Sequence, residues 1–220
     1  ESKAAFLPRF FKTGKGEYGE GDQFIGVVVP NLRIVAKKHF DADFDTLREL
    51  LASPYHEYRL TALLALTYRY AKFKDLASRE ACVNFYVSQV DAINNWDLVD
   101  LSCYKILGHW LFDKDKQLLY DWAKENHLWK QRIAMISCMH FVKQGEFKDA
   151  LAIADLLQHH PHDLIHKAVG WILREIGKEN EQLLVDYLTP RYKEMPRTML
   201  RYAIERFEEG KRKAFLHSKV

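Results

Sequence analysis

Apolar residues recur at steps of three and four along most of the chain, as in Ile133, Ile136 and Met139. This spacing places apolar side chains on one face of an α-helix and predicts a succession of amphipathic helices. Short breaks that contain glycine or proline, such as residues 143–145 and 160–161, separate these segments. The pattern therefore predicts helices joined by short turns.

The expected helices cover residues 2–12, 30–39, 53–71, 78–90, 96–112, 115–125, 128–143, 146–158, 161–176, 179–189 and 196–207. A further helix ends at Leu51, and Asp43 or Asp45 is expected to cap it. Pro30 fits the first turn of the helix before that one. The β-branched run at residues 25–29 is the only strand-like piece and has no partner strand. We therefore predict an all-α protein made of helical hairpins, with residues 1–220 in a single domain.

Equivalent segments recur about every 35 to 37 residues, a period typical of stacked helical-hairpin repeats such as HEAT repeats. The repeat brings into register Arg59, Trp96, Arg132 and Lys167, and four residues further on Leu63, Asp100, Ile136 and Trp171. In a stack of repeats, equivalent positions line one continuous surface. A common groove is therefore expected to hold Trp96, Asp100, Arg132, Lys167 and Trp171.

Composition adds a few limits. The chain is 48% hydrophobic and 29% charged, which is enough apolar material for a core. The net charge of +3 is too small to indicate a polyanionic partner by itself. Both ends of the chain are basic and the middle is net acidic, which fits either phosphate contacts at the ends or a solvated helix face.

The cysteines indicate a reducing compartment. Cys82, Cys103 and Cys138 are odd in number, and each lies in a helical apolar pattern, so buried free thiols are expected. The sequence has neither an apolar run near the roughly 20 residues of a membrane span nor a visible signal peptide. The chain begins at Glu1 without a methionine, so its true N-terminus is left open. The expected location is the cytoplasm, as in bacteria, near nucleoid DNA.

Two short motifs are rejected. Gly14, Gly16 and Gly19 spell a G-x-G-x-x-G, but no strand precedes it, so it does not indicate a dinucleotide site. His162 and His166 have the spacing of a zinc-protease helix but lack its glutamate. We expect no metal and no cofactor.

Trp96 and Asp100 are the most informative pair, because residues four apart share one helix face. An indole beside a carboxylate is unusual for a core-facing stripe and wasteful on a solvent face. Two plainer explanations stay open at this point. The tryptophans can be core residues, and Asp100 can form a structural salt bridge with Arg132 across adjacent repeats.

Three segments carry a family resemblance: residues 95–100 (Asn-Trp-Asp-Leu-Val-Asp), residues 127–132 (His-Leu-Trp-Lys-Gln-Arg) and residues 165–175, with Lys-Ala-Val-Gly-Trp-Ile-Leu-Arg-Glu. They resemble the signature segments of the DNA alkylation repair family, the AlkD-like DNA glycosylases. The front end, from Lys12-Thr13-Gly14 through residues 24–27 to Pro30, is similar to the family as well. The resemblance spans nearly the whole chain.

The resemblance implies a HEAT-like solenoid that holds duplex DNA in a concave basic groove, as a monomer. It also implies excision of N3- and N7-alkylated purines, a 3-methyladenine/7-methylguanine glycosylase activity, without flipping of the base into a pocket. The implied catalytic residues are Asp100, Trp96, Arg132 and Trp171. The residues expected to contact DNA are Lys130, Arg132, Lys167, Arg174 and Arg59. The N-terminal tyrosine of the family has no secure match in Tyr18, because the loop spacing differs.

The residue types suit this chemistry. Cleavage of a purine–deoxyribose bond passes through a cationic, oxocarbenium-like sugar. An alkylated purine already carries positive charge and leaves without a general acid, so one carboxylate, Asp100, suffices to stabilise the cation. The faces of Trp96 and Trp171 attract a cation, and the guanidinium of Arg132 fits a phosphate. A non-catalytic DNA-binding repeat protein and a protein-interaction scaffold are the alternatives.

Overall fold

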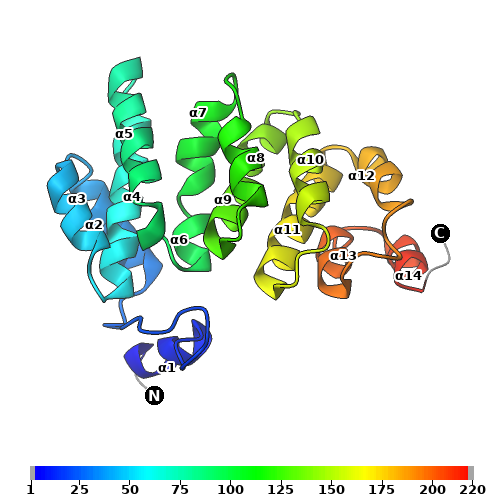
Figure 1. The fold of residues 1–220 in the computed structure, drawn as a ribbon, viewed down its shortest axis with the longest axis horizontal. Helices are drawn as coiled ribbons and strands as arrows, with labels where there is room; N and C mark the ends of the chain where they lie inside the picture. The colour runs from blue at the N-terminus through cyan, green and yellow to red at the C-terminus, as the bar shows by residue number, and fades with distance from the viewer. Residues whose placement is uncertain (1–2, 218–220) are drawn as a thin grey trace. The chain divides into compact units, whose positions relative to one another are not determined.

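The computed structural model describes residues 3–217, and α-helices dominate this range (Figure 1). The only β-pairing within the described range is a single bridge between Gln23 and Tyr55. The predicted all-α class is confirmed. The chain divides into two compact units, residues 1–110 and residues 111–220. Whether the two units form one domain, as predicted, stays a prediction.

Unit 1 begins with a short helix, a glycine-rich loop and an extended segment, and then becomes helical. Its elements are α1 (Lys3–Phe10), α2 (Val29–Lys38), α3 (Phe44–Leu51), α4 (His56–Lys72), α5 (Leu76–Ser88), the 3-10 turn η1 (Val90–Ala92), α6 (Trp96–Asp100) and the π-helical turn η2 (Tyr104–Gly108), with α7 (His109–Leu111) at its boundary. Helices α2, α3, α5 and α6 all pack against α4. Unit 1 is therefore organised around α4.

Local sequence explains most helix starts in unit 1. The side chain of Asp43 accepts a hydrogen bond from the Thr46 amide (2.7 Å), which confirms the predicted cap of α3. Asp75 caps α5 in the same way through the Ser78 amide (2.8 Å). Pro30 lies in the first turn of α2, as predicted.

The continuous helix expected over residues 96–112 is wrong. The chain instead forms the five-residue α6, a turn, then η2 and α7. The hydroxyl of buried Ser102 donates to the carbonyl of Leu98 (2.5 Å) and lies 3.1 Å from the hydroxyl of Tyr86. A serine that bonds back to the carbonyl four residues earlier competes with the helical ladder and bends the helix. α6 is thus a single turn that is not continued as an α-helix.

Unit 2 consists of helices joined by short turns, namely α8 (Gln117–Lys124), α9 (Leu128–Lys143), α10 (Lys148–Leu157), α11 (Asp163–Glu179), α12 (Glu181–Leu188), α13 (Arg197–Ala203) and α14 (Glu209–Leu216). Helices α9, α11 and α13 pack side by side, and α8 and α10 pack together on α9. Two layers of helices result, as expected for hairpin repeats. The predicted bounds of α9 are correct to the residue. α14 was not predicted, because its only buried residue is Phe215 and no apolar stripe marks it.

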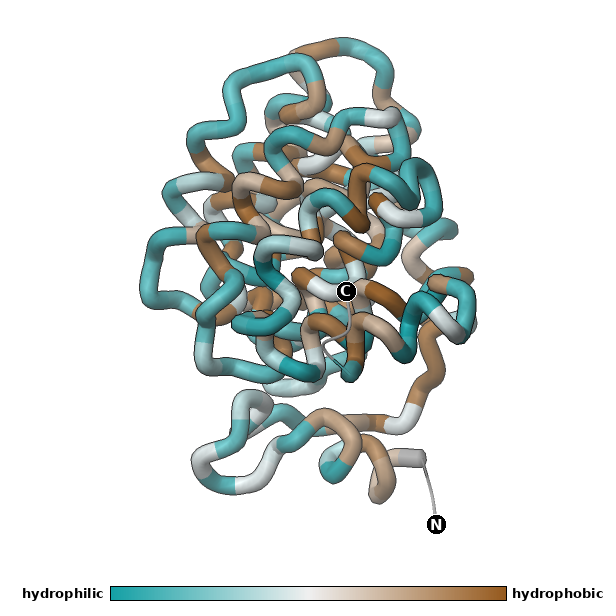
Figure 2. The backbone as a smooth tube through the Cα atoms, turned by 90° about the vertical axis from the view of Figure 1, so that its right-hand side faces the viewer, coloured by the Kyte–Doolittle hydropathy of each residue, from teal (hydrophilic) through white to brown (hydrophobic). Residues whose placement is uncertain are grey.

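Apolar side chains form the buried core of both units. Many of the outer turns of the chain are hydrophilic (Figure 2). The three cysteines are buried and free, as predicted. None of the described helices is long and apolar enough to cross a membrane.

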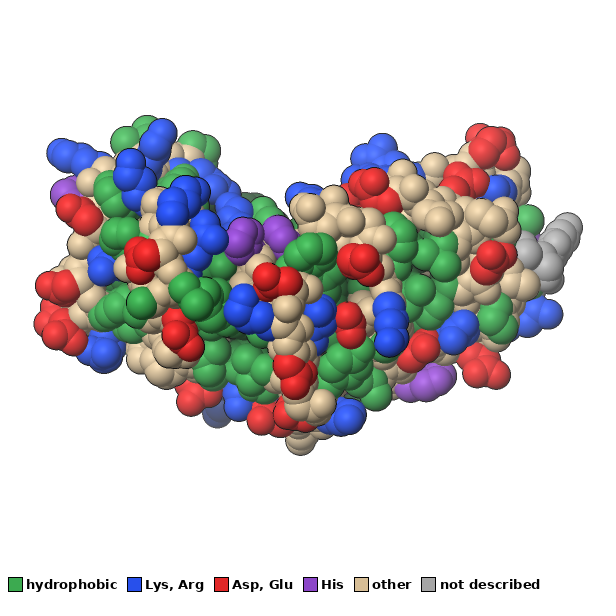
Figure 3. Space-filling model, turned by 90° about the horizontal axis from the view of Figure 1, so that it is seen from above, with side chains coloured by type: hydrophobic (Ala, Val, Ile, Leu, Met, Phe, Trp, Pro, Cys, Tyr) green, Lys and Arg blue, Asp and Glu red, His purple; other side chains and the backbone are tan. Residues whose placement is uncertain are grey.

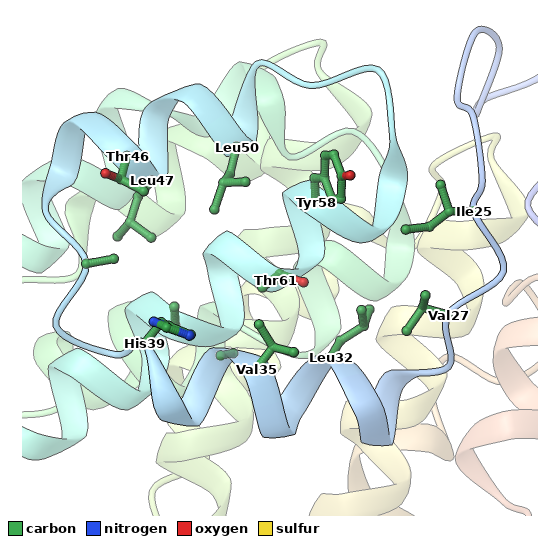
Figure 4. Close-up of a pocket in the computed structure, with 13 residues that line it drawn as sticks. Ile25, Val27, Leu32, Val35, His39, Thr46, Leu47, Leu50, Tyr58 and Thr61 are labelled. Carbon is green, nitrogen blue, oxygen red and sulfur yellow. The ribbon is translucent and has the colours of Figure 1, made fainter.

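One apolar cavity of about 430 Å³ lies in unit 1 (Figure 4). Helices α2 and α3 form its walls and α4 its floor, and Ile25 and Val27 of the extended segment close one end. The surface that it exposes is almost entirely carbon, although His39, Tyr58 and two threonines are among the residues that line it.

Gly170 allows the closest approach between α11 and its neighbour α13. A Cβ atom at this position would lie 2.5 Å from Cβ of Tyr202 and 2.6 Å from the carbonyl oxygen of Met199. Both are atoms that cannot move without a shift of the backbone. Gly177, further along the same helix, would instead meet the flexible end of Leu184 at 2.5 Å.

We therefore predict that Gly170→Ala lowers the free energy of unfolding by about 1–3 kcal/mol, the usual cost of overpacking. The matched substitution Gly177→Ala should be neutral or stabilising, because alanine favours helix by up to about 1 kcal/mol over glycine and the Leu184 side chain can turn away. Urea unfolding of both variants measures the difference. Equal stability of the two would contradict the close packing of α11 on α13.

Candidate functional site

Helix α6 presents a carboxylate and an indole together. Trp96 and Asp100 open and close this helix, and both are partly exposed. The residues between them, Asp97, Leu98 and Val99, are buried. Four residues advance a helix by just over one turn, so the two partly exposed side chains lie on the same face. Trp96 and Asp100 are thus the two residues of α6 that keep some exposed surface.

A stack of aromatic rings from the N-terminal segment covers Trp96. Phe11 lies parallel to the indole, with 5.3 Å between ring centroids, and Phe10 meets it edge-on at 5.8 Å. Phe11 also contacts Phe24 and the imidazole of His56, with 5.1 Å and 4.7 Å between ring centroids. Aromatic pairs at these separations each contribute about 0.5–1.5 kcal/mol beyond their burial. The plane of Trp96 is therefore set by residues far away in the sequence.

A buried group of charges lies beneath the aromatic stack. His56 opens α4, and its two ring nitrogens lie 3.1 Å from Asp22 and 2.8 Å from Asp97 of α6. Arg59, one turn further along α4, forms an ion pair with Asp22 (2.6 Å) and donates to the carbonyl of Ser53 (2.9 Å). Asn95 donates to Asp22 across 3.5 Å and accepts from the Trp96 amide (2.8 Å). The loop, α4 and α6 are thus joined by ionic hydrogen bonds.

The protonation of this group follows from its contacts. Burial alone lowers the pKa of His56, but the hydrogen bonds to Asp22 and Asp97 and the charges of both carboxylates raise it to about 9. Burial raises the pKa of Asp22, yet the bond from His56 and the charge of Arg59 hold it below its usual value. At neutral pH His56 is therefore an imidazolium that donates to both carboxylates, and two cations balance two anions.

Arg132 lies in α9 of unit 2 and is only 4% exposed. Its guanidinium donates to the carbonyl of Leu164 in the first turn of α11. Its positive charge also helps to hold the pKa of His162 below the usual value, after the larger effect of burial. Arg132 therefore anchors the start of α11. The phosphate contact expected for it stays a prediction.

Trp171 and Lys167 lie in α11, four residues apart, and both are partly buried. Lys167 forms an ion pair with Asp163 one turn earlier (2.7 Å). The equivalent positions in other repeats differ, because Leu63 and Ile136 are buried in their helices. The repeat period by itself therefore does not give equivalent residues the same environment.

Every basic residue expected to contact DNA has an acidic partner in the structure or lies buried. Lys130 pairs with Glu125 (2.7 Å), and Arg174 pairs with Glu205 and, at 3.6 Å, with Glu175. A partly exposed pair is worth about 0–1 kcal/mol, so a phosphate can displace such a carboxylate. Breaking a buried pair costs about 3–5 kcal/mol, and the pair of Arg59 is buried. We therefore leave Arg59 out of the proposed DNA contacts.

The histidines near the start of α11 act as backbone partners. His162 accepts from the Leu164 amide (3.1 Å), and His160 accepts from the His162 amide (3.0 Å). The ring of His166 bonds the carbonyl of His160. Within residues 3–217 no group of three His, Cys, Asp or Glu side chains could hold a metal ion. The expectation of a reaction without metal or cofactor stays a prediction.

A family model described as "DNA alkylation repair enzyme" matches residues 1–207 of the chain. The chain belongs to this family. Among solved structures, a predicted DNA alkylation repair enzyme from Enterococcus faecalis matches with a TM-score of 0.71 at 16% identity, covering 94% of this chain and 95% of that one. At this identity the likeness shows the fold alone. No protein of curated function matches the chain.

For this DNA alkylation repair family member, sequence reasoning found α6 but missed what holds it. Asp22, His56 and Asp97 are separated by 34 and 41 residues, and no periodic pattern connects them. No sequence signal singles out these three residues, because charged residues such as Arg59 and Arg69 also occur elsewhere in α4. The partly exposed Tyr18 lies in the loop, and we assign it no DNA contact.

Two further cations lie beside Phe10, whose ring packs against Trp96. Arg9 and Lys12 line a hollow of about 440 Å³ with Phe6, Phe10 and Glu17. Lys12 has a positive φ of 55°, a backbone conformation uncommon for residues other than glycine, two residues after the end of α1. Figure 3 shows that Lys and Arg side chains also gather over the helices of unit 1 at the left of the view. Arg9 and Lys12 therefore join the candidate phosphate contacts.

The raised pKa of His56 predicts a loss of stability in alkali. A pKa raised from about 6.5 in the unfolded chain to about 9 in the folded one gives a contribution that is complete below pH 6.5 and disappears as the pH rises through 9. The shift corresponds to about 3 kcal/mol. Urea unfolding of wild type and His56→Gln between pH 6 and 10 measures it. Burial also raises the pKa of the Cys82 thiol, so the quantity to follow is the difference in unfolding free energy between the two proteins. A difference that stays constant with pH would contradict the imidazolium.

Proposed function

We propose that this protein is a DNA glycosylase that hydrolyses the N-glycosidic bond of N3- and N7-alkylated purines without moving the base into a pocket. The observation that carries the proposal is the pair Trp96 and Asp100, which share the accessible face of a helix whose other residues are buried. Membership in the DNA alkylation repair enzyme family supports DNA as the substrate. The surface of the apolar cavity between α2, α3 and α4 is almost entirely carbon, so this cavity does not supply the hydrogen-bonding groups that would read a flipped base.

The reaction needs little from the protein. The bond from C1′ to the purine nitrogen breaks, and its electron pair neutralises the positively charged base, which leaves without a proton. The sugar cation that remains is stabilised by the carboxylate of Asp100 and by the face of Trp96. Water then bonds to C1′ and loses a proton to solvent. We propose that two residues of unit 2 also act on the DNA, Trp171 through the face of its indole and Arg132 through its guanidinium.

Binding of the duplex is proposed to come from partly exposed cations. Lys130, Lys167 and Arg174 in unit 2 and Arg9 and Lys12 in unit 1 are the candidates. Phosphates would replace the carboxylates that now pair with the first three. The exchange of one anion for another keeps the cations satisfied and releases counterions from the DNA.

The proposal predicts that Asp100→Asn slows excision far more than it weakens binding. The substitution keeps the shape of the side chain and removes the charge that faces the sugar cation, which should cost about 10²- to 10³-fold in rate. Duplex affinity should hold or rise slightly, because a carboxylate near phosphates repels them. Single-turnover excision and a binding titration on the same DNA measure both. An equal fall in rate and in melting temperature would indicate a structural role for Asp100 instead.

The phosphate contacts predict a steep salt dependence. Affinity for duplex DNA should fall by about 10³-fold or more between 50 and 200 mM salt if six or more phosphates are engaged. Replacing Lys12 by Gln should reduce the slope by about one unit, and Lys72→Gln, an exposed cation at the far end of α4, serves as the control. A flat salt profile would favour a protein-interaction scaffold.

The decisive experiment is incubation with a duplex that contains 7-methylguanine, followed by detection of the free base. Release that persists in EDTA supports a glycosylase that needs no metal. Salt-dependent binding with no released base would instead identify a non-catalytic DNA-binding protein.

A further inference from the structure

Helix α6 is too short to orient its own side chains. It contains five residues, and a helix of one turn has not yet recovered the cost of nucleation. The residues before it, Ile93 to Asn95, are not helical, and after it the chain turns at Leu101 and Ser102 before it becomes helical again at Cys103. This turn separates α6 from the helical segment that follows. The orientation of Trp96 and Asp100 must come from contacts that α6 makes with the rest of unit 1.

Asp97 makes the ionic contact of α6 with α4. It lies between Trp96 and Asp100 in sequence, and its side chain is buried, so it extends away from the accessible face that those two residues share. Its carboxylate accepts from His56 at 2.8 Å. A hydrogen bond between charged partners is about twice as strong as a neutral one and has a narrower geometry. This bond therefore fixes both the position of α6 and its rotation.

His56 is in turn held from the other side. Asp22 accepts from its second ring nitrogen, and Arg59 balances the charge of Asp22 at 2.6 Å. The neighbouring Glu57 accepts from the amides of Ile25 (3.1 Å) and Gly26 (2.8 Å), which fixes the segment that follows Asp22. These are the charged groups that surround His56, and all of them are buried.

We propose that His56 is a positioning residue, whose imidazole between Asp22 and Asp97 fixes the orientation of α6 and thereby of Trp96 and Asp100. This inference rests on the proposed function for its effect on excision. Phe11 acts in the same direction, because its ring touches both His56 and Trp96. Buried ionic groups often add little stability compared with an apolar replacement, and fixing one arrangement is their better attested role.

The test compares two variants of this contact with a control on the same helix. His56→Gln removes the positive charge and one of the two donors. Asp97→Asn keeps the shape and weakens the bond, and it serves as the second variant if His56→Gln does not fold. Tyr70 lies in α4 14 residues, or about 21 Å, beyond His56. Tyr70→Phe removes its buried hydroxyl, which lies 2.8 Å from His109. It is the matched control.

Two readouts are taken at a fixed interval below the melting temperature of each protein. The first is single-turnover excision at saturating DNA together with DNA affinity. The second is the ¹⁹F NMR signal of Trp96 in protein labelled with 5-fluorotryptophan, assigned with Trp96→Phe. We expect both variants to move the Trp96 signal and His56→Gln to slow excision about 10- to 100-fold, since small misplacements of reacting groups have effects of this size. DNA affinity should stay within about twofold, and Tyr70→Phe should change neither readout.

Three results would overturn the inference. The first is a Trp96 signal that is unchanged in both variants, and the second is the same change of this signal in Tyr70→Phe. The third is a change in His56→Gln but not in Asp97→Asn, which would show that His56 acts through packing and not through Asp97. Failure of the proposed function is distinguishable. If wild type releases no base, the glycosylase assignment falls, but the fluorine signal still tests the position of α6.

Discussion

A one-turn helix depends on its surroundings for its direction, and this constraint governs unit 1. The two candidate site residues, Trp96 and Asp100, lie on α6, while the ionic bond that fixes α6 joins Asp97 to His56 on α4. His56 is itself fixed through Asp22, the last residue of the glycine-rich loop. The N-terminal segment thus contributes to the site through buried charge and stacked rings. Removing the loop would leave a buried imidazolium with one partner, at a cost of several kcal/mol.

The fold was predictable wherever periodicity and capping acted alone. The bounds of α9 and the cap of α3 at Asp43 follow from a local pattern, and the structure has both. The prediction was wrong at residues 96–112, where apolar periodicity continues but the helix does not. There the hydroxyl of Ser102 bonds to the carbonyl of Leu98, an event that depends on its burial against Tyr86. Periodicity records which face is apolar and does not record such competition for backbone groups.

The site was predictable only in part, for a related reason. Trp96 and Asp100 could be found because one helix turn relates them in sequence. The repeat register put Arg59 and Arg132 at equivalent positions, and both were expected to contact DNA. Both are instead buried, and they donate to the backbone carbonyls of Ser53 and Leu164. A basic residue looks the same in sequence whether it binds a phosphate or a carbonyl. Only tertiary structure, which brings Asp22 to Arg59, separates the two cases.

The remaining cations differ in what a phosphate must displace. Lys167 is bound to Asp163 on the same exposed helix face, and the loss of such a pair costs at most about 1 kcal/mol. Arg132 has its guanidinium buried at the start of α11, so a phosphate reaches it only if that turn moves. The DNA contacts proposed for the lysines would therefore leave the fold intact, whereas the contact proposed for Arg132 would require a rearrangement of the turn that also carries His162. On this proposal, a phosphate bound by Arg132 must compete with the anchoring of α11, and a phosphate bound by Lys167 competes only with an exposed ion pair.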